Sequence, residues 1–131
     1  MPGVNAMTDI TGFGLAGHLR EMCEGSGVSA ELDARAIPRI DGIDRYIEKG
    51  CLPGGTERNF RACEAAITDV TGAERAILCD PQTSGGLLIA VAPDATDRVE
   101  KLLQDSGLPA RAIGRLVPIH SGGGIQIGLK R

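Results

Sequence analysis

The sequence predicts an α+β domain in which helices pack on a small mixed or antiparallel sheet. Helical and strand patterns follow one another without regular βαβ alternation, which favours this class. The 19 glycines cluster with prolines and polar residues in no fixed repeat, so tight turns are expected and a collagen or a plain helical bundle is excluded. With 131 residues and only three aromatic side chains, the chain is expected to form one domain with an aliphatic core.

The first helix is expected to begin near Thr11, because apolar residues recur there at spacings of three and four. Gly25 and Gly27 are expected to end it as C-terminal caps. The segment Val28–Leu32 then alternates apolar and polar residues, which predicts a short strand. The apolar stripe of the helix consists of Phe13, Leu15, Ala16, Leu19 and Met22.

The middle of the chain gives weaker signals. Pro38 interrupts the pattern, and a short helix carrying Ile40, Ile43 and Ile47 is expected to end at Gly50. The Pro-Gly-Gly core of Leu52–Asn59 predicts a loop. Phe60–Ile67 is expected to form one or two helical turns, and the short apolar segment Ala76–Cys79 fits a helix or a strand.

The last third predicts three strands and one helix. Leu87–Val91 is a continuous aliphatic run, which predicts a buried strand. Asp94 is expected to cap a helix that extends to Gln104 and stops at Gly107, with Val99, Leu102 and Leu103 facing inward. The chain then closes with the strands Ala112–Val117 and Ile125–Leu129 and, between them, the glycine-rich loop Pro118–Gly124.

Charge and hydropathy exclude several classes of protein. The formal net charge is −3, and lysine and arginine are dispersed, so a nucleic-acid-binding surface is not expected. No apolar run approaches the length of a membrane span. The first residues show neither a basic leader nor an apolar signal core, so a cytoplasmic protein is expected.

The four cysteines form no C-x-x-C pair, which disfavours a zinc site and a secreted disulfide framework. Reduced thiols, buried or on the surface, are expected instead. The sequence leaves open the individual roles of Cys23, Cys51, Cys63 and Cys79.

The motif TDITGFG is the first candidate site. Asp9 is expected just before a helix, where its carboxylate can cap helical N–H groups or hold Mg²⁺. Gly12 and Gly14 let the backbone approach a ligand closely, and Thr8 and Thr11 add hydroxyl groups. These residues suit a metal-bridged polyphosphate. The alternative is a capped helix in which the glycines serve packing alone.

The motif DPQTSGG is the second candidate site. Asp80 and the proline after it start a turn, and hydroxyl and bare backbone N–H groups follow before the strand, where they can form a ligand-facing rim. The alternative is a plain loop-to-strand turn. A nucleophilic Ser84 is disfavoured because the G-x-S-x-G pattern is missing. His18 and His120 lack companions at metal-ligand spacing, so a surface or packing role is expected for each.

Four stretches in register resemble one family. TDITGFGLAGHL, LPGGTERN, LCDPQTSGGLLIAV and the tail GRLVPIHSGGGIQI are similar to successive motifs in the C-terminal domain of selenophosphate synthetases. The resemblance covers nearly the whole chain. It extends more distantly to aminoimidazole ribonucleotide synthetase, thiamin-monophosphate kinase and a hydrogenase-maturation protein, which share the two-domain plan.

The resemblance implies a role in an enzyme that makes selenophosphate, AMP and phosphate from ATP, selenide and water. Residues 1–131 would be its C-terminal domain. The N-terminal domain, absent from this chain, would bind ATP, supply several Mg²⁺-binding aspartates and a nucleophilic cysteine or selenocysteine, and form most of a homodimer interface.

Within this chain, the resemblance implies that Asp9 is a metal ligand and that no residue is the catalytic nucleophile. The cofactor, ATP with Mg²⁺, would meet the phosphate-side residues Thr8, Thr11, Gly12 and Gly14. The isolated chain is therefore expected to be inactive. Two alternatives stay open: a related ATP-dependent synthetase or kinase, and a stand-alone α+β module that binds a small ligand.

Overall fold

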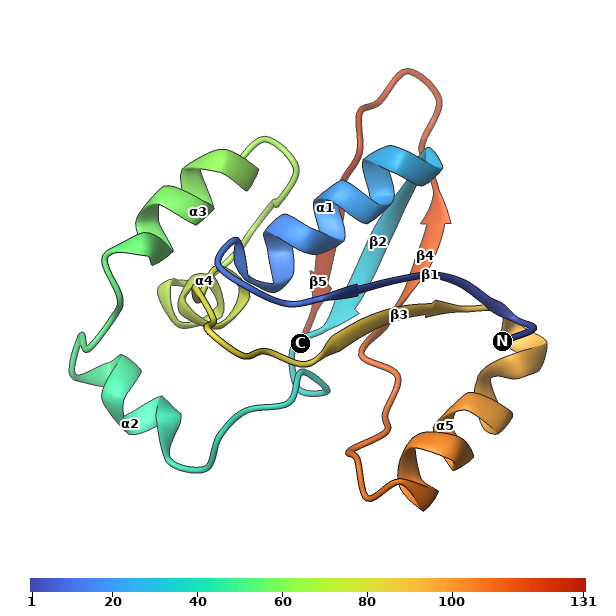
Figure 1. Cartoon of the computed structure of the whole chain (residues 1–131). Helices are drawn as coiled ribbons and strands as arrows, with labels where there is room; N and C mark the ends of the chain where they lie inside the picture. The colour runs from blue at the N-terminus through green and yellow to red at the C-terminus, as the bar shows by residue number, and fades with distance from the viewer.

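The computed structural model describes residues 1–131 and confirms the α+β class (Figure 1). The strands are β1 (Val4–Asp9), β2 (Val28–Asp33), β3 (Leu87–Val91), β4 (Gly114–Pro118) and β5 (Ile127–Lys130). The helices are α1 (Gly14–Ser26), α2 (Ile43–Glu48), α3 (Gly55–Cys63), α4 (Gly72–Leu78) and α5 (Thr96–Asp105), with a 3₁₀ turn, η1, at Pro93–Ala95. None of these helices has the length and hydropathy of a membrane-spanning segment.

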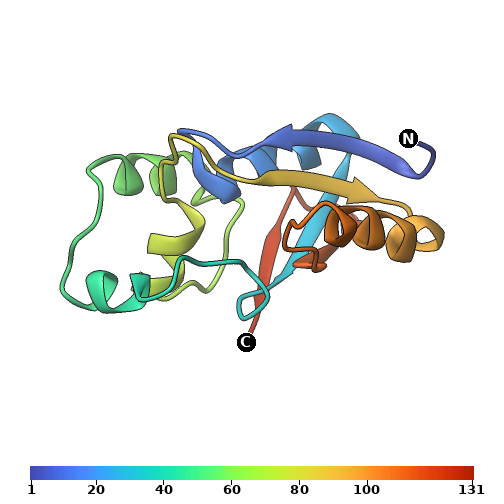
Figure 2. The same ribbon diagram turned by 60° about the horizontal axis from the view of Figure 1, so that its bottom comes forward.

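The strands divide into two sheets. β1 pairs with β3 in an antiparallel ribbon, and β2 lies between antiparallel β4 and parallel β5. The chain thus contains two units with the same order of elements, β1–α1–β2 and β3–α5–β4. The first strands of the two units, β1 and β3, pair antiparallel, and so do the last strands, β2 and β4. An approximate two-fold axis between the units would produce this pairing. Helices α2, α3 and α4 connect the units and gather on one side of the molecule, while α5 lies beside β3 on the other (Figures 1 and 2).

Strand β1 is the element that the sequence did not predict. Its residues alternate between half-buried and exposed positions, and it pairs with β3 from Val4 opposite Val91 to Asp9 opposite Leu87. The segment VNAMTD has little of the β-branched character that marks a strand, so tertiary pairing rather than local propensity makes it one.

The first helix and the strand after it are confirmed. Helix α1 begins at Gly14, three residues later than expected, and buries Leu15, Leu19 and Cys23. Gly27 adopts the left-handed conformation with φ of 64°, and its N–H donates to the carbonyl of Cys23, as expected for a C-terminal cap.

The prediction for the middle of the chain is partly wrong. The segment Leu52–Asn59 is not all loop, because α3 begins at Gly55 and ends at Cys63, short of the expected Ile67. Its buried residues, Thr56, Asn59 and Cys63, recur at helical spacing. The ambiguous apolar segment Ala76–Cys79 is mostly helical and belongs to the end of α4.

For the last third of the chain, the predicted order of helices and strands is confirmed, but some of the predicted details are wrong. Strand β3 has the expected bounds, but of its residues only Leu88 is buried. Asp94 does not cap a helix; it lies in η1, because Pro93 starts a 3₁₀ turn and α5 begins afterwards at Thr96. In α5 Val99 faces inward as expected, whereas Leu102 is 51% exposed.

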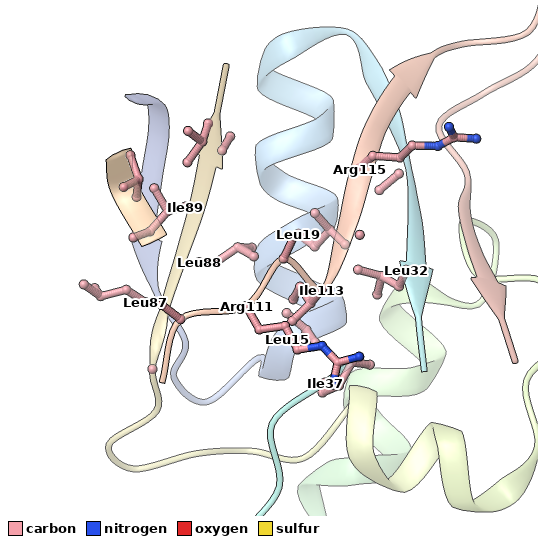
Figure 3. Close-up of a pocket in the computed structure, with 18 of the residues that line it drawn as sticks. Leu15, Leu19, Leu32, Ile37, Leu87, Leu88, Ile89, Arg111, Ile113 and Arg115 are labelled. Atoms are coloured by element: carbon pink, nitrogen blue, oxygen red, sulfur yellow. The ribbon is translucent and has the colours of Figure 1, made fainter. Parts of the chain in front are cut away.

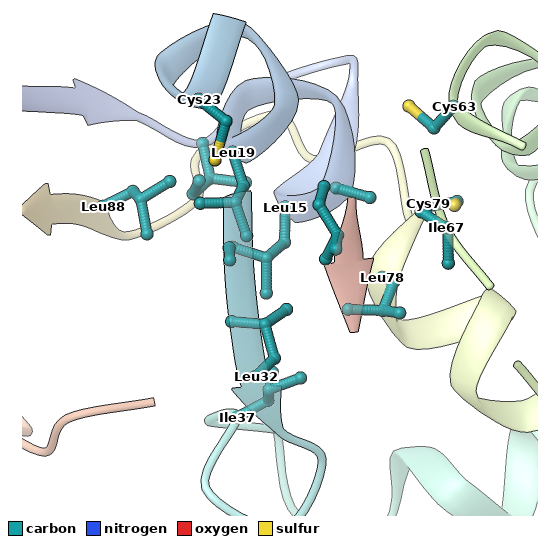
Figure 4. Packing of buried hydrophobic residues seen from close by; sticks show 14 residues of the cluster. Leu15, Leu19, Cys23, Leu32, Ile37, Cys63, Ile67, Leu78, Cys79 and Leu88 are labelled. Atoms are coloured by element: carbon teal, nitrogen blue, oxygen red, sulfur yellow. The ribbon is translucent and has the colours of Figure 1, made fainter. Parts of the chain in front are cut away.

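The core is aliphatic, as expected. Fourteen buried residues from both sheets and from α1, α3 and α4 pack together, and no aromatic side chain is among them (Figure 4). The cluster consists of Ile10, Leu15, Ala16, Leu19, Cys23, Ala30, Leu32, Ile37, Cys63, Ile67, Leu78, Cys79, Leu88 and Ile127.

The start of α4 carries a bidentate ionic contact with the residue at position 131. Thr71 and Glu74 form a reciprocal capping box, and the guanidinium of Arg131 donates to both Glu74 carboxylate oxygens at 2.8 and 3.0 Å. The hydrogen bonds from Arg131 and from the Thr71 backbone lower the pKa of Glu74 to about 2. The C-terminal residue is thereby tied to the first turn of a helix.

The lowered pKa of Glu74 gives a pH-dependent expectation. Its stabilising effect is complete above the pKa of the unfolded chain, about 4.5, and is lost as the pH falls toward about 2. The Glu74→Gln variant keeps a capping amide but loses the charge. Its free energy of unfolding, measured by urea denaturation, should lie below that of the wild type near pH 7 and converge with it near pH 2. Glu48→Gln, an exposed change, is the control; a gap independent of pH would contradict the assignment.

Candidate functional site

The motifs TDITGFG and DPQTSGG lie against each other, and we call them the paired loops (residues 8–14 and 80–86). The Ile10 N–H donates to the carbonyl of Gly86 at 2.8 Å, and the N–H of Gly85 donates back to the carbonyl of Ile10 at 3.1 Å. These bonds continue the β1–β3 ladder past its last pair. The two candidate sites of the sequence are therefore one place in the structure.

Two glycines let the paired loops approach this closely. Gly14 has a φ of +72°, and a Cβ there would lie 2.9 Å from the carbonyl oxygen of Asp80. A Cβ on Gly85 would overlap the carbonyl oxygen of Ile10. Gly12 differs, because it is exposed and a Cβ on it would meet nothing within 4 Å. Packing thus explains Gly14 and Gly85 but not Gly12.

Asn59 joins the third motif, LPGGTERN, to both loops. Its amide Nδ2 donates to the carbonyl of Gly12 at 2.8 Å and to that of Cys79 at 3.1 Å, and the residue is only 5% exposed. A buried carbonyl without a donor is costly, so this one side chain satisfies two groups that the loops leave free. Sequence analysis missed Asn59, although its helical spacing from Thr56 and Cys63 was a usable signal.

Asp9 ends β1 with an exposed side chain, and neither a hydrogen bond nor an ion pair engages its carboxylate. The interpretation of Asp9 as a helix cap is wrong, because β1 extends to Asp9 and the N-cap position of α1 is Phe13, with no side-chain cap. The carboxylate is a hard oxygen donor of the kind Mg²⁺ prefers. No cluster of three histidine, cysteine or acidic residues surrounds it.

The hydroxyls of the first loop face different partners. Thr8 Oγ1 donates to the backbone carbonyl of Asp9 at 3.2 Å. Thr11 Oγ1 lies 3.0 Å from Nε2 of His18, which is 8% exposed. His18 has the expected packing role, since its ring centroid lies 5.6 Å from that of Phe13, but the contact with Thr11 also brings it into the site.

In the second loop, Thr83 and Ser84 are exposed, and burial raises the pKa of the Asp80 carboxyl. All four cysteines are free thiols. Burial raises the pKa of Cys23 and Cys63, and that of Cys79 to about 12. Thiols with raised pKa values are weak nucleophiles.

A cavity of about 760 Å³ lies between β3 and α5 on one side and α1, β2 and β4 on the other (Figure 3). Leu15, Leu19 and Leu88 are among its mostly aliphatic lining residues. Thr8, Asp9, Thr11 and Gly12 do not line it. The lining does include Ile10, Gln82 and Gly86 of the paired loops, together with the charged residues Glu100, Arg111 and Arg115.

Comparison with known proteins finds relatives over nearly the whole chain. The C-terminal domain described as AIR synthase related protein matches residues 1–125. The selenide, water dikinase of Escherichia coli (strain K12) is 52% identical over 120 residues, covering 92% of this chain and 35% of that protein. The one from Pasteurella multocida (strain Pm70) is 55% identical over 114 residues, covering 87% and 32%. The chain thus spans about a third of the length of these relatives.

One solved structure supports the fold. Thiamine-monophosphate kinase from Stenotrophomonas maltophilia K279a superimposes with a TM-score of 0.60, covering 97% of this chain and 31% of that chain. Its sequence identity of 20% makes this a likeness of fold alone.

The glycines of the first loop give a matched pair of variants. Gly14→Ala places a Cβ at positive φ against backbone atoms of residues 78–80, and it should lower the free energy of unfolding by about 3 kcal/mol. Gly12→Ala has room for its methyl group and should change stability by less than about 0.5 kcal/mol. Urea denaturation measures both; equal effects would contradict this difference in packing.

Asn59 gives a second expectation. Asn59→Leu keeps the volume of the side chain but leaves the buried carbonyl of Cys79 and the part-buried carbonyl of Gly12 without this donor, so the chain should lose about 3 kcal/mol of stability. The amides of Gly85 and Gln82, which bond across the paired loops, should also exchange faster with solvent. Arg58→Ala, an exposed change in the same helix, is the control. Unchanged exchange at these two amides would show that Asn59 does not hold the loops together.

Proposed function

Because this chain belongs to the family of AIR synthase related proteins, through their C-terminal domain, we propose that it is the C-terminal domain of a selenide, water dikinase. The observation that carries the proposal is the identity of more than half of the aligned residues with enzymes of that name over most of the chain. The whole protein would then make selenophosphate, AMP and phosphate from ATP, selenide and water.

In this proposal the paired loops form one wall of a cleft for the metal-bound polyphosphate of ATP. Asp9 supplies one carboxylate ligand to Mg²⁺, which neutralises charge on the phosphate oxygens and orients them. Asp9 is suited to this role because its carboxylate is exposed and unpaired. Gly12 is suited to close approach by a ligand because nothing in the chain occupies the space beside it.

Helix α1 adds an electrostatic contribution to the same wall. It starts at Gly14, directly after the first loop, and runs for 13 residues. Its first N–H groups have no partners within the helix, and its dipole favours negative charge at this end. Phosphate oxygens in the cleft would therefore face an attractive potential.

The exposed apolar residues around Asp9 support a second wall outside this chain. Met7, Phe13 and Leu87 are 60%, 59% and 57% exposed, and Leu87 lies directly opposite Asp9 in the β1–β3 ribbon. Apolar side chains grouped at a polar site indicate an interaction surface. We propose that the ATP-binding part of the longer protein covers them, supplies the remaining metal ligands and nucleophile, and forms the homodimer.

The nucleotide product separates this proposal from its alternatives. A related kinase with another substrate would release ADP and would not need selenide. A stand-alone binding module would give no nucleotide turnover when joined to an ATP-binding domain.

The test is the substitution Asp9→Asn in the longer protein. Selenide-dependent AMP formation should fall at least about 100-fold, because the variant loses a charged metal ligand at the reacting phosphates, while the thermal unfolding of the protein stays unchanged. Asp94→Asn, an exposed change in η1, is the control and should keep full activity. An unchanged rate for the Asp9→Asn variant would refute the metal role, and ADP as the only nucleotide product would refute the selenophosphate reaction.

A further inference from the structure

The cavity between the β1–β3 ribbon and the three-stranded sheet is large for a chain of this size. Its volume is about 760 Å³, and 20 of the 31 residues that line it are hydrophobic. Protein interiors leave few voids larger than a water molecule, and water in an apolar space lacks hydrogen-bond partners. Small-molecule sites occupy about 300–1,000 Å³ and are mostly apolar. The cavity therefore has the size and lining of a site for an apolar ligand.

The walls of the cavity are aliphatic on both sides. Leu88 extends from β3 toward Leu19 of α1, and Leu32 of β2 lies on the side of the other sheet (Figure 3). No aromatic side chain is among the lining residues. Flat ring systems gain from stacking on aromatic side chains, whereas a flexible alkyl chain needs only aliphatic contacts. The lining thus favours an alkyl chain over an aromatic or heterocyclic ring.

One positive charge at the cavity has no partner within the chain. Arg115 donates to the Glu31 carboxylate at 2.8 Å, and the Glu100 carboxylate accepts from the backbone N–H of Ala112 at 3.2 Å, so both of these lining groups are engaged. Arg111 also lines the cavity and is exposed, and neither a hydrogen bond nor an ion pair engages its guanidinium. A guanidinium presents a planar fork of donors that matches a carboxylate.

We propose that this cavity binds an aliphatic monocarboxylate, with its alkyl chain between β3 and β2 and its carboxylate on Arg111. The aliphatic walls remove the alkyl chain from water, which is the main favourable contribution to binding. The exposed position of Arg111 leaves the carboxylate paired and partly hydrated, so no charge is buried without compensation. The site is separate from the proposed nucleotide chemistry, because Asp9 and Gly12 lie outside the lining.

Chain length tests the apolar part of the proposal. Hexanoate, octanoate and decanoate, each below its critical micelle concentration, are titrated into this chain while the methyl resonances of Leu19 and Leu88 are followed by NMR. The shifts should saturate, and the affinity should rise about fourfold for each added methylene that is buried. An affinity independent of chain length would overturn the proposal, because it would place the ligand outside the cavity.

The charge of Arg111 tests the polar part. Arg111→Gln should weaken decanoate binding about fivefold, as expected for an ion pair at an exposed position, and should leave the binding of uncharged 1-decanol unchanged. Arg58→Gln removes the same charge from another exposed arginine, one that does not line the cavity, and should have no effect. Equal losses of decanoate affinity in the two variants would contradict a specific contact with Arg111.

Filling the cavity tests its location. Ala90 lines the cavity and lies on the same face of β3 as Leu88, because side chains two residues apart in a strand share a face. Ala90→Leu should lower the affinity for decanoate at least about tenfold without lowering the thermal unfolding midpoint, since the added side chain occupies free space. Ala73→Leu, an exposed change in α4, is the control. A lowered midpoint with unchanged decanoate affinity would overturn the proposal.

Free carboxylates and anionic membrane lipids share this ligand chemistry. The cavity lies between two layers of the fold, so it should take up a free carboxylate and not a chain anchored in a bilayer. Phosphatidylglycerol vesicles should therefore not sediment together with the chain. Sedimentation with the vesicles and no saturable binding of decanoate would show that the cavity faces a membrane, which would overturn the proposal. None of these measurements involves nucleotide turnover, so this inference and the proposed reaction can fail separately.

Discussion

The arrangement of the site depends on one buried amide. The paired loops are short and rich in glycine, and they have few side chains with which to hold each other. Nδ2 of Asn59 reaches from α3 to the carbonyl of Gly12, inside the first loop, and to that of Cys79, directly before the second, and so joins three stretches of sequence that lie far apart. The β1–β3 ladder fixes the loops from one end and this amide fixes them from the other. Asp9, at the end of β1, is held in place by both.

The sequence predicted those elements whose local pattern agrees with their tertiary surroundings. Helix α1 has a regular apolar stripe and a glycine at the left-handed cap position, and β3 is a continuous aliphatic run, so both were expected. Strand β1 was missed, and helix α3 was predicted only from Phe60 onward, because the local signals at these places point elsewhere. VNAMTD is too polar to suggest a strand until β3 pairs with it, and the Pro-Gly-Gly start of α3 suggests a loop although three buried residues follow at helical spacing.

The candidate site was predicted as two motifs whose meeting could not be foreseen. Residue types indicated Asp9, the threonines and the glycines, but only the fold separates Gly14, which packing requires, from Gly12, which it does not. Likewise, only the fold shows that His18 contacts Thr11, which lies seven residues earlier, before the start of α1. Asn59 belongs to the stretch LPGGTERN, but its hydrogen bonds to Gly12 and Cys79 become visible only when its neighbours are known.

The burial of the thiols has a practical consequence for studying this domain. Cys23, Cys63 and Cys79 are enclosed in the core, while Cys51 is exposed between α2 and α3, next to the motif that carries Asn59. Thiol-directed dyes and spin labels require an accessible thiolate, so they should modify the folded domain at Cys51 alone. The sequence thus offers a single attachment point, from which movements near the start of α3 can be followed spectroscopically without removing any cysteine.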